Sequence, residues 1–234
     1  MSEPTPPTIA ADLLPEATRR LIRTVDALAD DDYAAPSGCA GWTRGHVIAH
    51  LALNAEGLAG ALRGIVEGDP MPMYASQERR DGDIDQLAGA SPSVLRARLL
   101  GASTDLAEAY GAVPTDRMTT TIDRIPGGWT FPAEAVSVMR LQEVEIHHAD
   151  LATGYTRADW PSGFAALLLD NDLRKRTEPA LTAHATDLDR TWTVGAGGPT
   201  VSGAAADLGW WFTGRGDGTG LTSDSGTLPQ IGAR

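Results

Sequence analysis

The chain has 234 residues, 42% hydrophobic and 21% charged, which is enough to bury a core in one large domain or two small ones. Its formal net charge is -12 without a visible basic patch, which excludes a typical nucleic-acid-binding protein and argues against binding to an anionic membrane. A single cysteine, Cys39, excludes an intrachain disulfide and fits the reducing cytoplasm, where we expect the protein.

The start of the chain and its apolar runs argue against export and against membrane insertion. Residues 1–7 have neither the basic segment nor the apolar core of a signal peptide. No apolar run approaches the roughly 20 residues that are needed to cross a bilayer. We therefore expect no membrane partner.

Helical spacing of apolar residues dominates the first two thirds of the chain. Thr43 suits the N-cap of a second helix, and Ser91 followed by Pro92 is typical of a helix start. Residues 111–130 are expected to form a loop with a short extended pair, and Gly154 is the expected stop of the last long helix. The predicted helices cover residues 9–28, 43–66, 76–87, 91–110 and 132–152.

The pattern changes after Gly154. Short extended segments now alternate with short helices, which is typical of an α+β domain. We therefore place a domain boundary near residues 154–158 and predict two domains, 1–155 and 156–234. The elements predicted in the second domain are helices over 164–173 and 203–213, strands over 181–185 and 190–194, and a strand end at 200–203.

Polar side chains interrupt the apolar face of the second predicted helix. His46, His50 and Asn54 follow one another at intervals of four residues, so they form a polar stripe on one helix face. Burying such a stripe is costly unless it lines a site. The stripe therefore indicates a functional site on this helix.

The last long predicted helix carries a carboxylate and an imidazole on one face. Glu143 and His147 are four residues apart, so their side chains can bind one metal ion together. A third ligand must come from another helix of a bundle, and either His46 or His50 can supply it. Two imidazoles and one carboxylate suit zinc, and they also suit non-haem iron(II).

The neighbours of this pair each have more than one role open to them by spacing alone. Asp150 could orient His147 by accepting a hydrogen bond, or it could be a solvated charge near the helix end. His148 is rotated by about 100° from His147, so we expect both His148 and Glu145 to face away from the metal. Cys39 could be a ligand or a nucleophile, but a lone loop cysteine is more often incidental.

Several segments together carry a resemblance to a known family. They are Gly41-Trp-Thr-Arg-Gly-His46-Val-Ile-Ala-His50-Leu-Ala-Leu-Asn54, Pro72-Met-Tyr74 with the following Arg80, Glu143-Val-Glu-Ile-His147-His-Ala-Asp150-Leu, and Trp210-Trp-Phe-Thr-Gly-Arg215-Gly-Asp-Gly. They resemble the mycothiol-dependent maleylpyruvate isomerases of the DinB-like metalloenzyme superfamily, over almost the whole chain. The resemblance implies an α+β protein with a DinB-like four-helix bundle followed by a small sterol-carrier-like α+β domain.

The resemblance also implies the site residues. It implies that zinc, or another divalent metal, is held by His50, Glu143 and His147, and so it selects His50 over His46. It further implies that Arg80 and Arg215 are catalytic and bind the cofactor.

The arginines have alternatives, and one position departs from the family. By spacing alone, Arg79 is as good a candidate for the site as Arg80, and either can lie on a solvated helix face. Arg215 can have a structural role in its glycine-rich loop. Glu145 stands where the family is expected to have an aromatic residue, so the rim of the pocket is expected to differ there.

The reaction that the resemblance implies is the cis–trans isomerisation of maleylpyruvate to fumarylpyruvate in aromatic catabolism. Reversible addition of a thiolate would allow rotation about the double bond, and the thiol would be a cofactor, mycothiol, activated by zinc. Arg80 and Arg215 would face the carboxylates of this small dicarboxylate and the developing enolate. Two alternatives remain: a thiol S-transferase for other electrophiles, and a non-catalytic metal-binding module whose C-terminal domain binds a partner or lipid.

Overall fold

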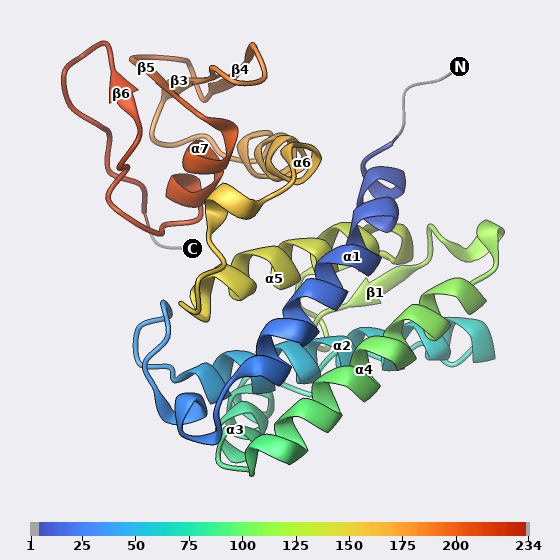
Figure 1. Cartoon of the computed structure of the whole chain (residues 1–234). Coiled ribbons are helices and arrows are strands. Elements are labelled where there is room, and N and C mark those ends of the chain that lie inside the picture. The colour runs from blue at the N-terminus through green and yellow to red at the C-terminus, as the bar shows by residue number, and fades with distance from the viewer. Residues whose placement is uncertain (1–4, 233–234) are drawn as a thin grey trace. The chain divides into compact units, whose positions relative to one another are not determined.

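The computed structural model describes residues 5–232, whose contacts divide the chain into two compact units, Met1–Gly154 and Tyr155–Arg234 (Figure 1). The first unit is mainly helical, and the second combines a small sheet with helices. The predicted α+β class is therefore confirmed. Within the described part of the chain, no helix has the length and apolar character that crossing a bilayer requires.

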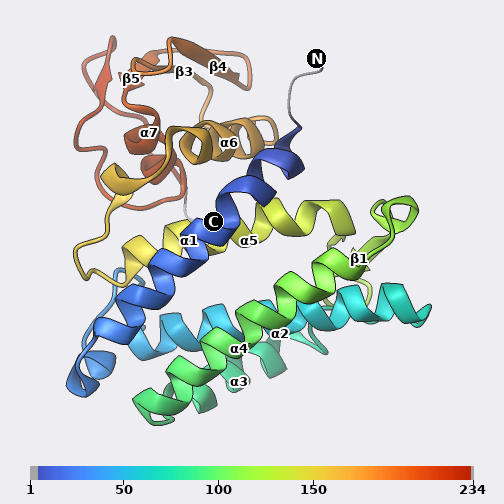
Figure 2. The ribbon, with the colours of Figure 1, turned by 45° about the vertical axis from the view of Figure 1, so that its right-hand side comes forward.

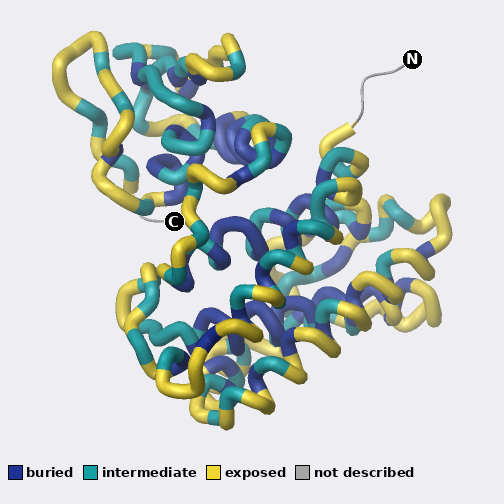
Figure 3. The backbone as a smooth tube through the Cα atoms, viewed as in Figure 1, coloured by how far each residue is buried: buried dark blue, intermediate teal, exposed yellow. Residues whose placement is uncertain are grey.

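Helices of the first unit pack along one another in pairs, α2 along α4 and α1 along α5 (Figures 1 and 2). Buried residues lie where the helices face each other, and exposed residues lie on the outside (Figure 3). Helix α2 also contacts α3 and α5, which buries most of its residues. The helices are α1 (Pro6–Ala27), α2 (Arg44–Glu67), α3 (Gln77–Ala88), α4 (Pro92–Ala112) and α5 (Val136–Asp150).

Local sequence signals explain where α2 begins and ends. The Thr43 hydroxyl accepts a hydrogen bond from the backbone N–H of His46, as predicted for an N-cap. The helix ends at Gly68, whose φ of 79° is the left-handed conformation that glycine adopts readily.

A short hairpin follows α4, formed by β1 (Thr121–Asp123) and β2 (Thr130–Pro132). This confirms the predicted extended pair, but β2 ends at Pro132, beyond the predicted range of 111–130, so α5 begins at Val136 and not at Pro132 as predicted. The loop between α2 and α3 is bound to the hairpin by two backbone hydrogen bonds of 2.9 Å, from Met73 N–H to Asp123 O and from Tyr74 N–H to Arg124 O. The hairpin thus determines where the start of α3 lies.

The second unit has a four-stranded sheet in the order β4-β3-β5-β6. Strands β3 and β5 are parallel, and the other neighbours are antiparallel. Helix α7 contacts β3 and β5, and α6 contacts α7 and β4, so apolar side chains of the helices and the sheet share one core. The elements are α6 (Ser162–Leu173), β3 (Leu181–Ala185), β4 (Arg190–Val194), β5 (Thr200–Gly203), α7 (Ala205–Phe212) and β6 (Thr222–Ser223).

Candidate metal centre

Three side chains from two helices converge in the first unit. His50 comes from α2, and Glu143 and His147 come from successive turns of α5. Oxygen Oε2 of Glu143 lies 2.8 Å from Nε2 of His50 and 3.3 Å from Nε2 of His147. One potential ligand atom from each residue lies within 4.8 Å of the others, which suits a shared metal ion.

His147 is held in the orientation that metal binding requires. Its Nδ1–H donates to Oδ2 of the buried Asp150 over 2.8 Å, so Nε2 is the atom that faces Glu143. Burial alone would lower the pKa of His147, but hydrogen bonds with Asp150, Cys39 and Glu143 outweigh it and raise that pKa well above its ordinary value. A metal ion must therefore displace a proton from Nε2.

The ring of His50 is held with its proton on the nitrogen that must bind the metal. Nη2 of Arg80 lies 3.1 Å from Nδ1 of His50, and because a guanidinium can only donate, Nδ1 accepts and the ring proton sits on Nε2. Burial lowers the pKa of His50 despite the nearby Glu143, so the ring is neutral. Binding a metal through Nε2 moves the ring proton to Nδ1, where it would face a second donor. Ligation by His50 therefore requires Arg80 to turn away.

Glu143 is the anion between the two imidazoles. Burial would raise its pKa, but the charge and hydrogen bonds of His50 and His147 lower that pKa well below its ordinary value. The carboxylate is therefore ionised at neutral pH. An ionised carboxylate with two imidazole nitrogens is a donor set that zinc accepts, so the residues present fit a divalent cation.

A buried cation lies beneath this carboxylate. Nη1 of Arg140 donates over 2.8 Å both to the backbone oxygen of Leu51 and to Oδ1 of Asn54. Burial lowers the pKa of Arg140 to about 10, which still leaves it charged at neutral pH, and the nearby Glu143 opposes that shift. Arg140 thereby fixes the amide of Asn54, the third member of the polar stripe on α2.

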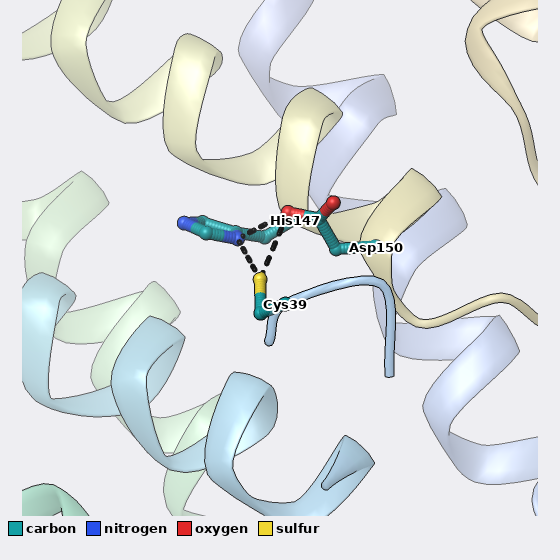
Figure 4. Close-up of side chains that lie close together, drawn as sticks. All are labelled: Cys39, His147 and Asp150. Carbon is teal, nitrogen blue, oxygen red and sulfur yellow. Dashed lines mark hydrogen bonds and ion pairs between the residues drawn. The ribbon is translucent and has the colours of Figure 1, made fainter. Parts of the chain in front are cut away.

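Cys39 lies at the other edge of the His147 ring (Figure 4). Its thiol donates to Oδ2 of Asp150 over 3.3 Å, and its sulfur is 3.9 Å from Nδ1 of His147. These three residues form a second group with ligand atoms within 4.8 Å of one another. Because Nδ1 already donates to Asp150, the simplest role for Cys39 is to support that carboxylate. Sequence reasoning treated Cys39 as incidental and missed this contact.

A cavity of about 200 Å³ opens beside the convergent side chains. Arg80 from α3 reaches it, whereas Arg79 points outward and pairs with Asp83 over 3.0 Å. The structure thereby separates two neighbours that spacing left equivalent. The residues that line the cavity include His50, Tyr74, Arg80, Arg124, Trp129 and Glu143.

Arg215 belongs to the second unit. Its guanidinium lies over the Trp210 ring, 5.7 Å from the centroid, and its Nη1 is 3.4 Å from the backbone oxygen of Thr213. These contacts account for its place in the glycine-rich loop. Its predicted contribution to the site stays a prediction.

Other polar residues of the two helices face elsewhere. His46 stays at the start of α2, where its Nδ1 lies 2.7 Å from the Thr43 hydroxyl. As predicted, Glu145 and His148 face away, Glu145 toward Arg20 of α1 and His148 toward Thr24 of α1, each over 2.8 Å. Glu145 is fully buried and does not line the cavity, so the expectation that it alters the rim is wrong.

Two lining residues come from the hairpin and were missed from the sequence. Arg124 and Trp129 flank the turn that joins β1 to β2, and both reach the cavity. The segment Pro126-Gly-Gly-Trp129 signalled a turn, but no local pattern says which helices a turn will contact.

Comparison with known proteins relates this geometry to a family. The sequence model of the mycothiol maleylpyruvate isomerase N-terminal domain matches residues 14–152. A crystal structure of the mycothiol-dependent maleylpyruvate isomerase is 27% identical, with a TM-score of 0.87 over 98% of this chain and 95% of that chain. A structure of a histidine-to-alanine mutant of such an isomerase is 26% identical, with a TM-score of 0.86 over the same shares. A search of curated protein sequences finds no match.

Proposed function

Because the chain belongs to the mycothiol maleylpyruvate isomerase N-terminal domain family, we propose that it is a cis–trans isomerase that converts maleylpyruvate to fumarylpyruvate with zinc and mycothiol. The observation that carries the proposal is the convergence of His50, Glu143 and His147 beside a cavity that holds an arginine. The likeness to the solved isomerase over nearly the full length of both chains supports the same class of reaction.

Bound zinc and mycothiol would together supply the reactive thiolate. Zinc bound to the three side chains would lower the pKa of the mycothiol thiol, and reversible addition of the thiolate would turn the substrate's double bond into a single bond that can rotate. The chain has one cysteine, and its thiol donates to Asp150, so it does not take the place of this cofactor. A thiol cofactor and a single cysteine both fit a cytoplasmic location.

The residues of the chain bind and orient the reactants. Asp150 keeps the proton of His147 on Nδ1 and so keeps Nε2 toward the metal position. Once His50 is a ligand, Nη2 of Arg80 is released and can donate to a substrate carboxylate or to the enolate that develops during addition, while Nη1 stays paired with Asp81. Local arginines are needed because the net charge of -12 repels an anionic substrate. We propose that Arg215 contributes a further positive charge.

The proposal is tested by incubating zinc-loaded protein with maleylpyruvate, with and without mycothiol, and following the absorbance of the conjugated product. We expect conversion that depends on both zinc and mycothiol. Consumption of other electrophiles without isomerisation would instead identify an S-transferase. Stoichiometric zinc without turnover of any thiol and electrophile would indicate a non-catalytic metal-binding module.

A further inference from the structure

Besides Arg80, the cavity is lined by a second arginine, Arg124, which has no role in the proposed reaction. Arg124 comes from the hairpin, and Arg80 comes from α3, so the two are far apart in the chain. Both lie over the ring of Tyr74, with Cζ 5.6 Å from the centroid for Arg80 and 5.5 Å for Arg124. Two positive charges therefore share one wall of a cavity that also contains Glu143.

The backbone of Arg124 is fixed on both sides. Its N–H donates to the backbone oxygen of Trp129 across the hairpin, and its oxygen accepts from the N–H of Tyr74, each over 2.9 Å. The same hairpin therefore places Arg124 and the ring on which both guanidinium groups lie. Such a position on fixed backbone keeps a binding group in place before the ligand arrives.

The side chain of Arg124 has a neutral partner. Its Nη1 donates to Oε1 of Gln77 over 2.8 Å, and within residues 5–232 Arg124 forms no ion pair with a carboxylate, although the charge of Arg124 helps to lower the pKa of Asp81, the ion-pair partner of Arg80. By contrast, Arg79 pairs with Asp83 and Arg98 pairs with Glu56. A half-buried guanidinium that faces a cavity and has no ion-pair partner of its own can accept an anionic ligand at little cost.

We propose that Arg124 and Arg80 form a two-point clamp that binds the two carboxylates of one dicarboxylate molecule, and that Arg124 makes the site select dicarboxylates over monocarboxylates. This inference rests on the proposed function, which supplies Arg80 as the first anchor. The two guanidinium carbons lie at most about 11 Å apart, because each is within 5.6 Å of the same ring centroid. This upper limit keeps both guanidinium groups within reach of one short dicarboxylate whose ends each accept charge-assisted hydrogen bonds of about 2.8 Å.

Trp129 covers the same part of the cavity. Its side chain is 55% exposed, although its ring lies against Phe131 with 5.2 Å between centroids. Such a large exposed indole beside two guanidinium groups can cover the hydrocarbon part of a bound dicarboxylate. The hairpin thereby contributes both a charged group and an apolar cover.

The test measures binding without turnover. Isothermal titration calorimetry of the zinc-loaded chain would use fumarylpyruvate and two analogues, each with one carboxylate replaced by a methyl group. We expect Arg124→Met, which keeps an unbranched side chain beside Tyr74, to weaken fumarylpyruvate binding by about 10- to 100-fold. The analogue that lacks the carboxylate held by Arg124 should change by less than about 3-fold, and Arg124→Lys should recover part of the affinity.

Arg79→Met is the matched control, because it removes the same charge from a side chain that pairs with Asp83 outside this cavity. It should leave all three affinities unchanged. Equal weakening of all three ligands by Arg124→Met, or no weakening, would overturn the clamp. Zinc content and the unfolding midpoint of each variant verify that it is folded and loaded. If the wild type binds fumarylpyruvate but does not isomerise maleylpyruvate, the proposed reaction fails while the clamp stands.

Discussion

The two sides of the cavity are built in different ways. The side with the potential ligands stands on α2 and α5, two long helices that pack against each other. The side with the positive charges stands on the start of α3 and on the hairpin, and two backbone hydrogen bonds join the hairpin to the loop before α3. On the helical side, the spacing of Glu143 and His147 within α5 already sets two of the three ligand positions, whereas every group of the charged side depends on segments that are distant in sequence. The first is therefore suited to holding a metal, and the second to holding an anion with groups from separate segments.

The sharpest way to break the helical side is His50→Ala. Partners of metal ligands alone are worth about 10- to 100-fold in affinity, so losing a ligand should cost more than about 1,000-fold and abolish activity. The measurement is the zinc content of purified protein by mass spectrometry. His46→Ala, one turn earlier on α2, should keep its zinc and lose at most about 1 kcal/mol of stability at the helix start. Full zinc occupancy in His50→Ala would refute the ligand set.

The charged side is tested by Arg80→Met. We expect kcat/KM for maleylpyruvate to fall by about 100- to 1,000-fold, because the guanidinium faces charge that develops during the reaction. Zinc affinity should not fall, because the variant removes a donor that opposes a proton on Nδ1 of His50. Steady-state kinetics and zinc titration separate the two effects. Weaker zinc binding in Arg80→Met, with Arg79→Met unchanged, would show that Arg80 supports the ligands rather than the substrate.

A smaller effect is expected when the support of His147 is removed. Asp150→Asn replaces the carboxylate that fixes the ring proton on Nδ1, and zinc affinity should fall by about 10- to 100-fold. Competition with a chromogenic chelator measures this change. An unchanged affinity would mean that packing alone orients the ring.

The smallest effect is expected for Cys39→Ala. The thiol is a weak donor to Asp150, so its loss should change zinc affinity by less than about 3-fold and stability by about 1 kcal/mol or less. Chelator competition and thermal unfolding report the two quantities. A loss of zinc comparable to that of His50→Ala would instead make the group of Cys39, His147 and Asp150 the true metal site.

The contrast between the two sides also explains what the sequence could and could not reveal. Intervals of four residues place side chains on one helix face. The sequence alone therefore predicts both the pairing of Glu143 with His147 and the polar stripe of α2. Spacing could not choose between His46 and His50, because that choice depends on how far along α5 the helix α2 packs. The resemblance to the family made this choice, and the structure brings His50 to the pair.

The charged side could be predicted less well, because its position again depends on contacts between segments that are distant in sequence. Arg124 and Trp129 lie in a turn whose position depends on long-range backbone hydrogen bonds, and these leave no periodic signal. Likewise, the departure at Glu145 suggested an altered rim, but the residue pairs with Arg20 in the interior. The direction in which a charged helix residue faces depends on which neighbouring helix supplies its partner.

The contact between Arg80 and His50 couples two binding equilibria. The guanidinium cannot donate to Nδ1 of His50 while that atom carries the ring proton, so ligation of a cation by Nε2 and release of the arginine are one event. By thermodynamic reciprocity, if a bound cation raises the affinity of Arg80 for an anion, then a bound anion must raise the affinity for the cation by the same factor. If the chain binds its metal and a dicarboxylate as proposed, the two would be cooperative ligands, and the dicarboxylate would protect the metal-loaded chain against loss of its ion.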